Sequence, residues 1–584
     1  MTKSMSETRL KRTLSSALWS AYGDALGFPT ELASEELVKK RVGQSRSIRT
    51  SQWKRLVGGK FGAEVTLPVG CYSDDTQLRL STSRAISGQG YFDVEAFAKI
   101  EMPVWQIYAL GAGRGSKAAA SSLGNRSTNW FSNFFKGYES GGGNGAAMRI
   151  QPHVWAASKL DDKPSYLVDV IRNAICTHGH MRGIAGAVVH ALSLAHVLLH
   201  GRMALDSEWL RYSDDIRSIP SLIRSDNDLL TFWVPAWEKN SKTSLELAAE
   251  EVANEWSLAV RKAMDRFAET NESPATLYAK IVEENNGLSK EERGSGVKSA
   301  LFANVAALLG QRAGSQEIME IVVNLLWSDT DTIASMAGAL IGAAKPDVKF
   351  IGEIQDEPYI RMEANRLFNI SQGVSEDTFS YPDTLYWQAP RAAIDTLKVI
   401  DGHYVVQGFG DVSPLGQRFA GRQKGAVWQW FATGWGQRLL IRMRAELEVG
   451  SEVVHKAAER EKNIADLFDY QFDDSLVDAE QSVLDSDLKF IAEVAPPPSI
   501  VKQSYAESKQ ALAVDVSSEG DNTPNKPITI DIDAMSSEAI KSFDPELIGQ
   551  HLLLLAEQPN GVTLATGYAS IVAKARATRL RHKR

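Results

Sequence analysis

The sequence predicts an all-α N-terminal domain, followed by a small β-rich unit and a helical C-terminal segment. Apolar residues recur at intervals of three and four through most of the first 350 residues, which is the period of a helix. After residue 380, glycine-containing turns at 401–402 and 433–436 separate short β-prone runs. A chain of 584 residues is long enough for several domains. We therefore expect four parts, with the boundaries 1–365, 366–490, 491–528 and 529–584.

The helices of the first domain follow from this periodicity. Leu10, Leu14 and Leu18 lie on one face of a helix predicted over 7–25, which should end before Gly27. Convincing strands, which an alternation of apolar and polar residues would mark, are not apparent up to about residue 350. Further helices are predicted over 71–88, 163–200, 247–268, 297–312, 315–327 and 331–344.

The β-rich unit is predicted from two hairpin patterns. The runs 397–400 and 404–406 flank an Asp-Gly turn, and 426–431 and 437–444 flank a turn with two glycines. Aromatic residues on strands usually pack in a core. We favour that role over a recognition surface for three tryptophans of this unit, Trp428, Trp430 and Trp435.

The C-terminal part is predicted to contain a helix, a linker and a basic helical segment. A helix fits 451–468, and the polar, proline-containing composition of 491–528 is typical of a flexible linker. Helical periodicity returns over 536–580. For the basic residues of this segment, we favour a solvated helix end over a nucleic-acid contact: Lys574, Arg576, Arg579, Arg581, Lys583 and Arg584.

The composition is that of an ordinary globular protein, with 43% hydrophobic and 23% charged residues. The formal net charge of -8 argues against a protein that coats nucleic acid along its length. Two cysteines, Cys71 and Cys176, cannot form a disulfide framework or a thiolate zinc cluster. Neither a signal-peptide core nor an apolar run long enough to span a bilayer is apparent. We therefore expect a cytoplasmic protein without a membrane partner.

Two short acidic clusters lie far apart in otherwise apolar, helical surroundings: Ser73-Asp74-Asp75-Thr76 and Asp329-Thr330-Asp331-Thr332. Either cluster alone is best explained as a helix cap. Two such clusters contain more carboxylates than capping needs, and buried carboxylates are costly unless they are paired or bind a cation. Carboxylate and hydroxyl oxygens suit Mg²⁺ or Mn²⁺. We therefore expect the two clusters to meet and bind one or two divalent cations.

Three further motifs could contribute to a site. The backbone of Gly142, Gly143 and Asn144 could approach a diphosphate, although for a glycine run taken alone we favour a surface loop. His178 could bind a metal, but a capping or hydrogen-bonding role is the simpler interpretation. Glu31 follows the break in the first helix and, taken alone, would be assigned to solvent.

Taken in order, these motifs resemble those of the ADP-ribosylglycohydrolase family over about residues 8–345. The order is more specific than any single motif. The resemblance does not extend through the β-rich unit or the C-terminal segment. It rests on Gly23-Asp24-Ala25-Leu26-Gly27 with Glu31, Ser73-Asp74-Asp75-Thr76, Gly143-Asn144-Gly145-Ala146-Ala147-Met148-Arg149, Thr177-His178 and Asp329-Thr330-Asp331-Thr332-Ile333-Ala334.

The resemblance implies an all-α catalytic domain with two divalent cations, Mg²⁺ or Mn²⁺, in a cleft. It implies that Glu31 lies on a flap near the cations and acts as acid or base. One departure from the family pattern is that Trp327 and Ser328 stand where relatives commonly have two glycines. The implied metal ligands are Ser73, Asp74, Asp75, Asp329, Asp331 and Thr332, and the implied substrate-binding residues are Gly142, Gly143, Asn144 and His178.

The activity that the resemblance implies is metal-dependent hydrolysis of the bond between ADP-ribose and an acceptor. We favour an ADP-ribosylated protein side chain as substrate and partner. A free ADP-ribose metabolite is an alternative. ADP-ribosylated nucleic acid is less favoured but is kept open by the basic tail. A non-catalytic ADP-ribose-binding protein is the third alternative, because a fold does not establish activity.

Overall fold

The computed structural model describes residues 3–268, 272–384, 386–422, 425–447, 449–450, 531–558 and 561–581. The chain divides into two compact units, Met1–Ser451 and Glu452–Arg584. The helix predicted over 451–468 and the linker predicted over 491–528 lie outside the described residues.

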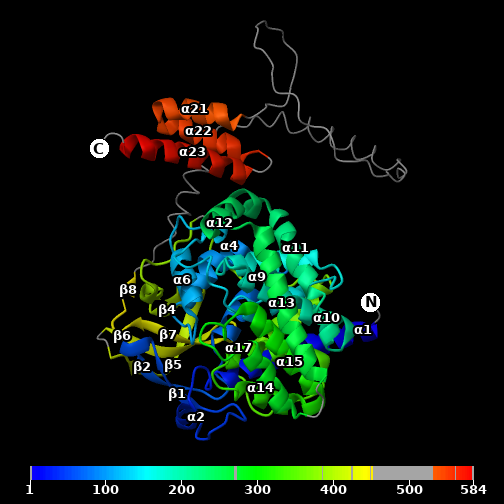
Figure 1. The fold of residues 1–584 in the computed structure, drawn as a ribbon. Helices are drawn as coiled ribbons and strands as arrows, with labels where there is room; N and C mark the ends of the chain where they lie inside the picture. Colours follow the sequence, from blue (N-terminus) through cyan, green and yellow to red (C-terminus); the bar gives the residue numbers. More distant parts are fainter. Residues whose placement is uncertain are drawn as a thin grey trace, which may run out of the picture. The chain divides into compact units, whose positions relative to one another are not determined.

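The first unit is built around two long-range helix partners, α1 (Lys3–Gly27) and α17 (Thr330–Ala344) (Figure 1). They approach closely because small residues face each other: a Cβ on Gly338 would lie 2.2 Å from the Trp19 carbonyl oxygen. A Cβ on Gly23 would likewise lie 2.2 Å from the Ala334 carbonyl oxygen. This packing brings the C-terminal end of α1 beside the start of α17, where the second acidic cluster lies.

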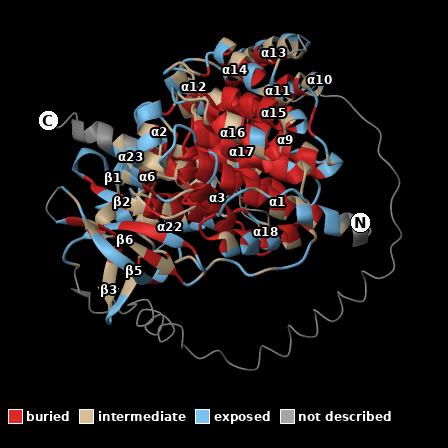
Figure 2. Cartoon of the chain, turned by 90° about the horizontal axis from the view of Figure 1, so that it is seen from below, coloured by how far each residue is buried: buried red, intermediate tan, exposed pale blue. Residues whose placement is uncertain are grey.

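The helices predicted from periodicity are confirmed, with ends that differ by a few residues, except that the span predicted over 163–200 is two helices separated at 176–180. Figure 2 shows buried residues concentrated along α3, α9, α15 and α17. The α-helices of this unit, besides α1 and α17, are α2 (Glu35–Val42), α3 (Asp74–Arg84), α4 (Val94–Ala96), α5 (Met102–Trp105), α6 (Arg114–Leu123), α7 (Gln151–Ala156), α8 (Pro164–Ile175), α9 (Met181–His200), α10 (Asp206–Trp209), α11 (Tyr212–Arg224), α12 (Val234–Ser241), α13 (Leu245–Ala268), α14 (Pro274–Glu284), α15 (Gly296–Ala313), α16 (Ser315–Val323) and α18 (Glu357–Ser371).

Short 3-10 and π segments join several of these helices. The π segments η2 and η5 each run directly into an α-helix, α5 and α12 respectively. The short segments are η1 (Gly59–Phe61), η2 (Phe97–Glu101), η3 (Trp130–Ser132), η4 (Ala147–Arg149), η5 (Leu229–Trp233) and η6 (Ala393–Asp395).

The expectation that no strand precedes residue 350 was wrong. β1 (Trp53–Val57) and β2 (Ala63–Leu67) form an antiparallel hairpin. β2 alternates apolar and polar residues but over five residues only, and β1 places two charged residues side by side, so the sequence signal is short and weak. The hairpin packs in one apolar cluster with Phe28 and Trp428, which joins it to the later sheet.

The β-rich unit is a six-stranded sheet in the order β7-β6-β5-β4-β3-β8, and both predicted hairpins are confirmed. All neighbouring strands are antiparallel except β3 and β8. Trp428 is buried, while Trp430 and Trp435 are half-buried and pack against apolar clusters, as a core role requires. The strands are β3 (Leu397–Ile400), β4 (His403–Val406), β5 (Gly410–Ala420), β6 (Ala426–Thr433), β7 (Arg438–Arg444) and β8 (Val449–Gly450).

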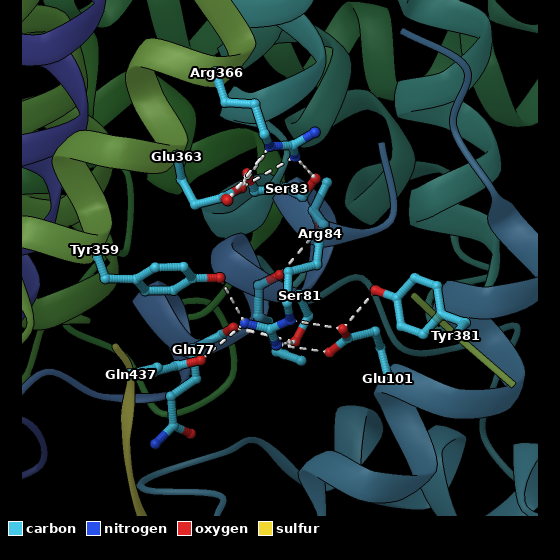
Figure 3. Close-up of polar contacts among 12 residues, drawn as sticks. Gln77, Ser81, Ser83, Arg84, Glu101, Tyr359, Glu363, Arg366, Tyr381 and Gln437 are labelled. Carbon is cyan, nitrogen blue, oxygen red and sulfur yellow. Dashed lines mark hydrogen bonds and ion pairs between the residues drawn. The ribbon is translucent and has the colours of Figure 1, made fainter. Parts of the chain in front are cut away.

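The sheet and the helices belong to one unit, and α18 runs across the boundary expected at 365/366. A buried polar network joins them (Figure 3). The Arg84 guanidinium, at the end of α3, donates to both carboxylate oxygens of Glu101 at 2.7 and 2.8 Å. It also donates to the side-chain oxygen of Gln437, beside β7, at 2.8 Å and to the Tyr359 hydroxyl at 3.2 Å. The sheet therefore holds the far end of α3.

In the part of the second unit that the structure describes, three helices confirm the predicted helical C-terminal segment: α21 (Ile532–Ser542), α22 (Pro545–Ala556) and α23 (Gly561–Arg581). They share a small core in which Ala539, Leu555, Tyr568 and Val572 are buried. This segment therefore has an apolar cluster of its own.

By length and composition alone α9 could cross a membrane, although Arg182, His190 and His196 interrupt its apolar run. Of its most apolar window, 83% is buried inside the fold. A core helix meets the same criteria, and α9 packs against α15, α17 and α8.

Candidate active site

A polar cavity of about 820 Å³ opens where α1, α3 and α17 end or begin. The fold brings both acidic clusters, His178, Glu31 and the glycine-rich residues 141–145 (the glycine loop) to this cavity from distant parts of the chain. Ser73 does not line the cavity but contacts Asp75, which does. The predicted site residues on its wall are Glu31, Asp74, Asp75, Gly142, Gly143, Asn144, His178, Asp329, Asp331 and Thr332.

The first acidic cluster is held by a residue that sequence reasoning did not assign to the site. Asp24, fully buried in α1, accepts the backbone N–H groups of Ser73 at 2.8 Å and Thr76 at 2.9 Å. Burial raises the pKa of Asp24, and these hydrogen bonds oppose that shift. The sequence signal is that Asp24 is the only charged residue in the second half of α1, between Thr13 and Gly27. Asp24 fixes the first turn of α3 and with it Asp74 and Asp75.

The backbone of the segment before α6 also holds Asp74 in place. Its Oδ1 accepts the Ala112 N–H at 2.7 Å. A Cβ on Gly111, which has φ +91°, would lie 2.5 Å from that oxygen, so only glycine fits this approach. Burial raises the pKa of Asp74 to about 7 against the Ala112 hydrogen bond, with further increases from Glu31 and Asp24.

Asp75 links the two acidic clusters. Its Oδ2 accepts the Ser73 hydroxyl at 3.2 Å and the Thr332 hydroxyl, from α17, at 3.3 Å. Its Oδ1 is buried without a hydrogen-bond partner. Burial raises the pKa of Asp75 well above its usual range, and the nearby Asp24, Asp74 and Asp329 add to the effect.

The second cluster is not used to cap its helix through Asp329. That residue precedes α17, but its side chain makes no capping hydrogen bond. Its Oδ2 instead accepts the side-chain N–H of Asn144 from the glycine loop at 2.9 Å. Asp331 Oδ1 accepts the Thr332 backbone N–H at 2.9 Å. Burial, followed by repulsion from Glu31 and Asp75, raises the pKa of Asp331 well above its usual range.

Glu31 lies half-buried on the cavity wall beside the β1–β2 hairpin. Its Oε2 is 3.4 Å from Arg55 Nη2, and Arg41 donates to the Pro29 carbonyl at 2.8 Å, which anchors the same loop. Burial raises the pKa of Glu31, Arg55 opposes the shift, and Asp329 adds to it. Sequence reasoning missed Arg55 because it missed the hairpin that carries it.

The His178 ring packs against the glycine loop. A Cβ on Gly145 would lie 3.1 Å from its Cε1, and one on Gly143 would lie 3.5 Å from its Nε2. The Thr177 hydroxyl lies 2.7 Å from His178 Nδ1. Burial, with a contribution from the nearby Arg149 cation, lowers the pKa of His178 to about 3. The ring is therefore neutral near pH 7 and helps shape the loop.

The chemistry of this wall fits hard divalent cations. Every candidate ligand is a carboxylate or hydroxyl oxygen, and Asp75 presents a buried oxygen with no partner. Neighbouring carboxylates raise one another's pKa, which a bound cation would relieve. Among the residues that the structure describes, no three carboxylate, histidine or thiol groups already form a compact ligand cluster. The fit therefore rests on the oxygen donors and the unpartnered Asp75 atom.

Comparison with known proteins identifies the family. The ADP-ribosylglycohydrolase family profile matches residues 5–345, which is more than half of the chain. The chain belongs to the ADP-ribosylglycohydrolase family. Members of this family hydrolyse ADP-ribose linkages and are in general metal-dependent.

The matched region ends at residue 345, the first residue after α17, so it contains every predicted site residue. A solved structure described as an "ADP-ribosylglycohydrolase-related protein complex" is similar over 62% of this chain and 99% of its own, with 20% identity and a TM-score of 0.37. No curated protein matches the sequence.

Proposed function

We propose that this ADP-ribosylglycohydrolase releases ADP-ribose from a modified protein side chain in a reaction that depends on two divalent cations, Mg²⁺ or Mn²⁺. The observation that carries the proposal is the convergence of five carboxylates from three segments on one cavity beside the glycine loop: Glu31, Asp74, Asp75, Asp329 and Asp331. A cluster of this kind is unfavourable unless a cation binds among the carboxylates.

The cations would be held by Asp74, Asp75, Asp329 and Asp331, with the hydroxyls of Ser73 and Thr332 completing the set. When bound, they would supply Lewis-acid stabilisation of the ribose oxygens next to the scissile bond. Backbone N–H groups of Gly142 and Gly143, with the Asn144 side chain, would orient the diphosphate and adjoining ribose.

Glu31 is the proposed acid or base of the reaction. Burial raises the pKa of Glu31, which is the direction that favours a carboxyl group acting as acid or base. Its salt bridge with Arg55 is long, at 3.4 Å, so the Glu31 carboxylate is only loosely paired. It would take a proton from the attacking water or deliver one to the leaving acceptor.

A release assay tests this proposal. The protein is incubated with arginine-linked, serine-linked and nucleobase-linked ADP-ribose and with a free ADP-ribose ester, each with Mg²⁺, with Mn²⁺ and with chelator. We expect release from a protein-linked substrate that chelator abolishes and that Glu31→Gln reduces strongly. Release only from the ester or only from the nucleobase would contradict the proposal of a protein substrate. Tight binding without any release would support a non-catalytic binder.

A further inference from the structure

Two turns beside the acidic cavity carry large apolar residues in a backbone conformation that favours glycine. Leu32 has φ +50° and Trp327 has φ +74°. Each is the third residue of a four-residue turn, 30–33 or 325–328, in which the last N–H donates to the first carbonyl at 3.1 and 3.3 Å. Positive φ at that position normally calls for glycine, and a branched or aromatic residue there is strained.

Burial does not explain this strain. Leu32 is 50% exposed and Trp327 is 51% exposed, so neither side chain completes the core. Ala112, on the same cavity, offers a contrast: it has φ +69°, and its N–H is turned to bind Asp74 at 2.7 Å. Unexplained strain at exposed residues is characteristic of functional positions.

Both strained residues lie next to cavity carboxylates. Leu32 follows Glu31 and lines the acidic cavity itself. Trp327 precedes Asp329 by two residues and lines a second hollow of about 560 Å³, together with the segment 34–36 that continues from Leu32. The two chain segments that bear Glu31 and Asp329 therefore extend from the acidic cavity into the second hollow.

The lining of the second hollow suits a polypeptide. It combines the carboxylates of Glu35 and Glu36, the guanidinium of Arg46, and apolar surface from Trp327 and Leu326. Two carboxylates against one cation would not attract a phosphate backbone. Exposed aromatic and aliphatic side chains next to mixed polar groups are instead typical of protein recognition surfaces.

We propose that Leu32 and Trp327 contact the polypeptide that carries the ADP-ribosylated side chain and thereby select protein-linked substrates. This inference rests on the proposed function, because it assumes that ADP-ribose occupies the adjoining cavity. The ADP-ribose portion would contact the glycine loop, and the segments flanking the modified residue would lie across Leu32, Trp327 and the second hollow.

The test compares binding of linked and free ADP-ribose. Leu32→Gly and Trp327→Gly are made in a Glu31→Gln background, which slows turnover during the measurement. The probes are free ADP-ribose, synthetic peptides that carry one ADP-ribosylated arginine or serine, and an ADP-ribosylated oligonucleotide. Lys242→Gly is the matched control, because Lys242 also has positive φ (+60°) but does not line either hollow.

We expect Trp327→Gly to weaken peptide binding about tenfold or more, while affinity for free ADP-ribose changes less than about twofold. Its melting temperature should fall no more than that of the control, because glycine relieves the strained backbone. Equal losses for peptide and free ADP-ribose, an equal loss for the oligonucleotide, unchanged peptide binding, or a clear loss of stability would each overturn the inference. Absence of ADP-ribose release by the parent protein would refute the proposed function alone, since this test measures binding.

Discussion

At the scale of single residues, the site depends on how each carboxylate is held. Asp75 has one oxygen that accepts two hydroxyls and another that is buried without a partner. Sequence reasoning could predict Asp75 because its motif places acids at a helix start. It could not predict Asp24, whose role arises only when α1 meets the first turn of α3. Contacts between distant segments are not visible in local sequence.

His178 gives a prediction of pH dependence. Because burial lowers its pKa to about 3, folded His178 stays neutral where an unfolded histidine binds a proton. Its contribution to the free energy of unfolding should therefore decline as pH falls below about 6.5, by up to about 1.4 kcal/mol per pH unit. Urea unfolding of the wild type and of His178→Gln between pH 7.5 and pH 5 measures the difference. An identical decline in both proteins would show that His178 does not cause this pH dependence.

At the scale of elements, helix periodicity predicted where the helices lie but not the break between α8 and α9, and turn chemistry predicted the hairpins β3–β4 and β6–β7 but not β5. The hairpin of β1 and β2 was missed because the alternation in β2 spans only five residues and β1 does not alternate. The boundary expected at 365/366 falls inside α18. Tyr359 of that helix accepts a hydrogen bond from Arg84, which also donates to Gln437 beside β7. The helix α18 therefore belongs to the network that joins α3 to the sheet.

The Arg84 network predicts a double-variant result. Removing Arg84 leaves the Glu101 carboxylate buried and unpaired, and we expect Arg84→Met to cost about 3–5 kcal/mol in the free energy of unfolding. Replacing both partners, as Arg84→Met with Glu101→Leu, should recover much of that loss. Chemical denaturation of the two single variants and the double variant checks this. A double variant as unstable as the sum of the single variants would contradict it.

At the scale of the whole molecule, the sheet is part of the unit that carries the site. Strand residues such as Val406, Phe431 and Ile441 lie in the same apolar cluster as the helices of the site. The helices α21, α22 and α23 have their own core within the second unit. This packing gives the sheet a structural role in the first unit.

Two truncations separate these roles. A chain that ends at residue 373, before the sheet, should fail to fold, because it exposes the apolar cluster that the strands cover. A chain that ends at residue 451 should retain the cooperative melting transition of the first unit and its ADP-ribose release. Circular dichroism and the release assay check both. A stable, active protein that ends at residue 373 would show that the sheet is dispensable.

The central claim is that aspartates from the two acidic clusters share divalent cations. Anomalous scattering from crystals grown with Mn²⁺ tests it most directly. The account predicts peaks within coordination distance of Asp75 and Asp331, which disappear in Asp75→Asn crystals. A map with no peak between the two clusters, at Mn²⁺ concentrations that support ADP-ribose release, would contradict the account.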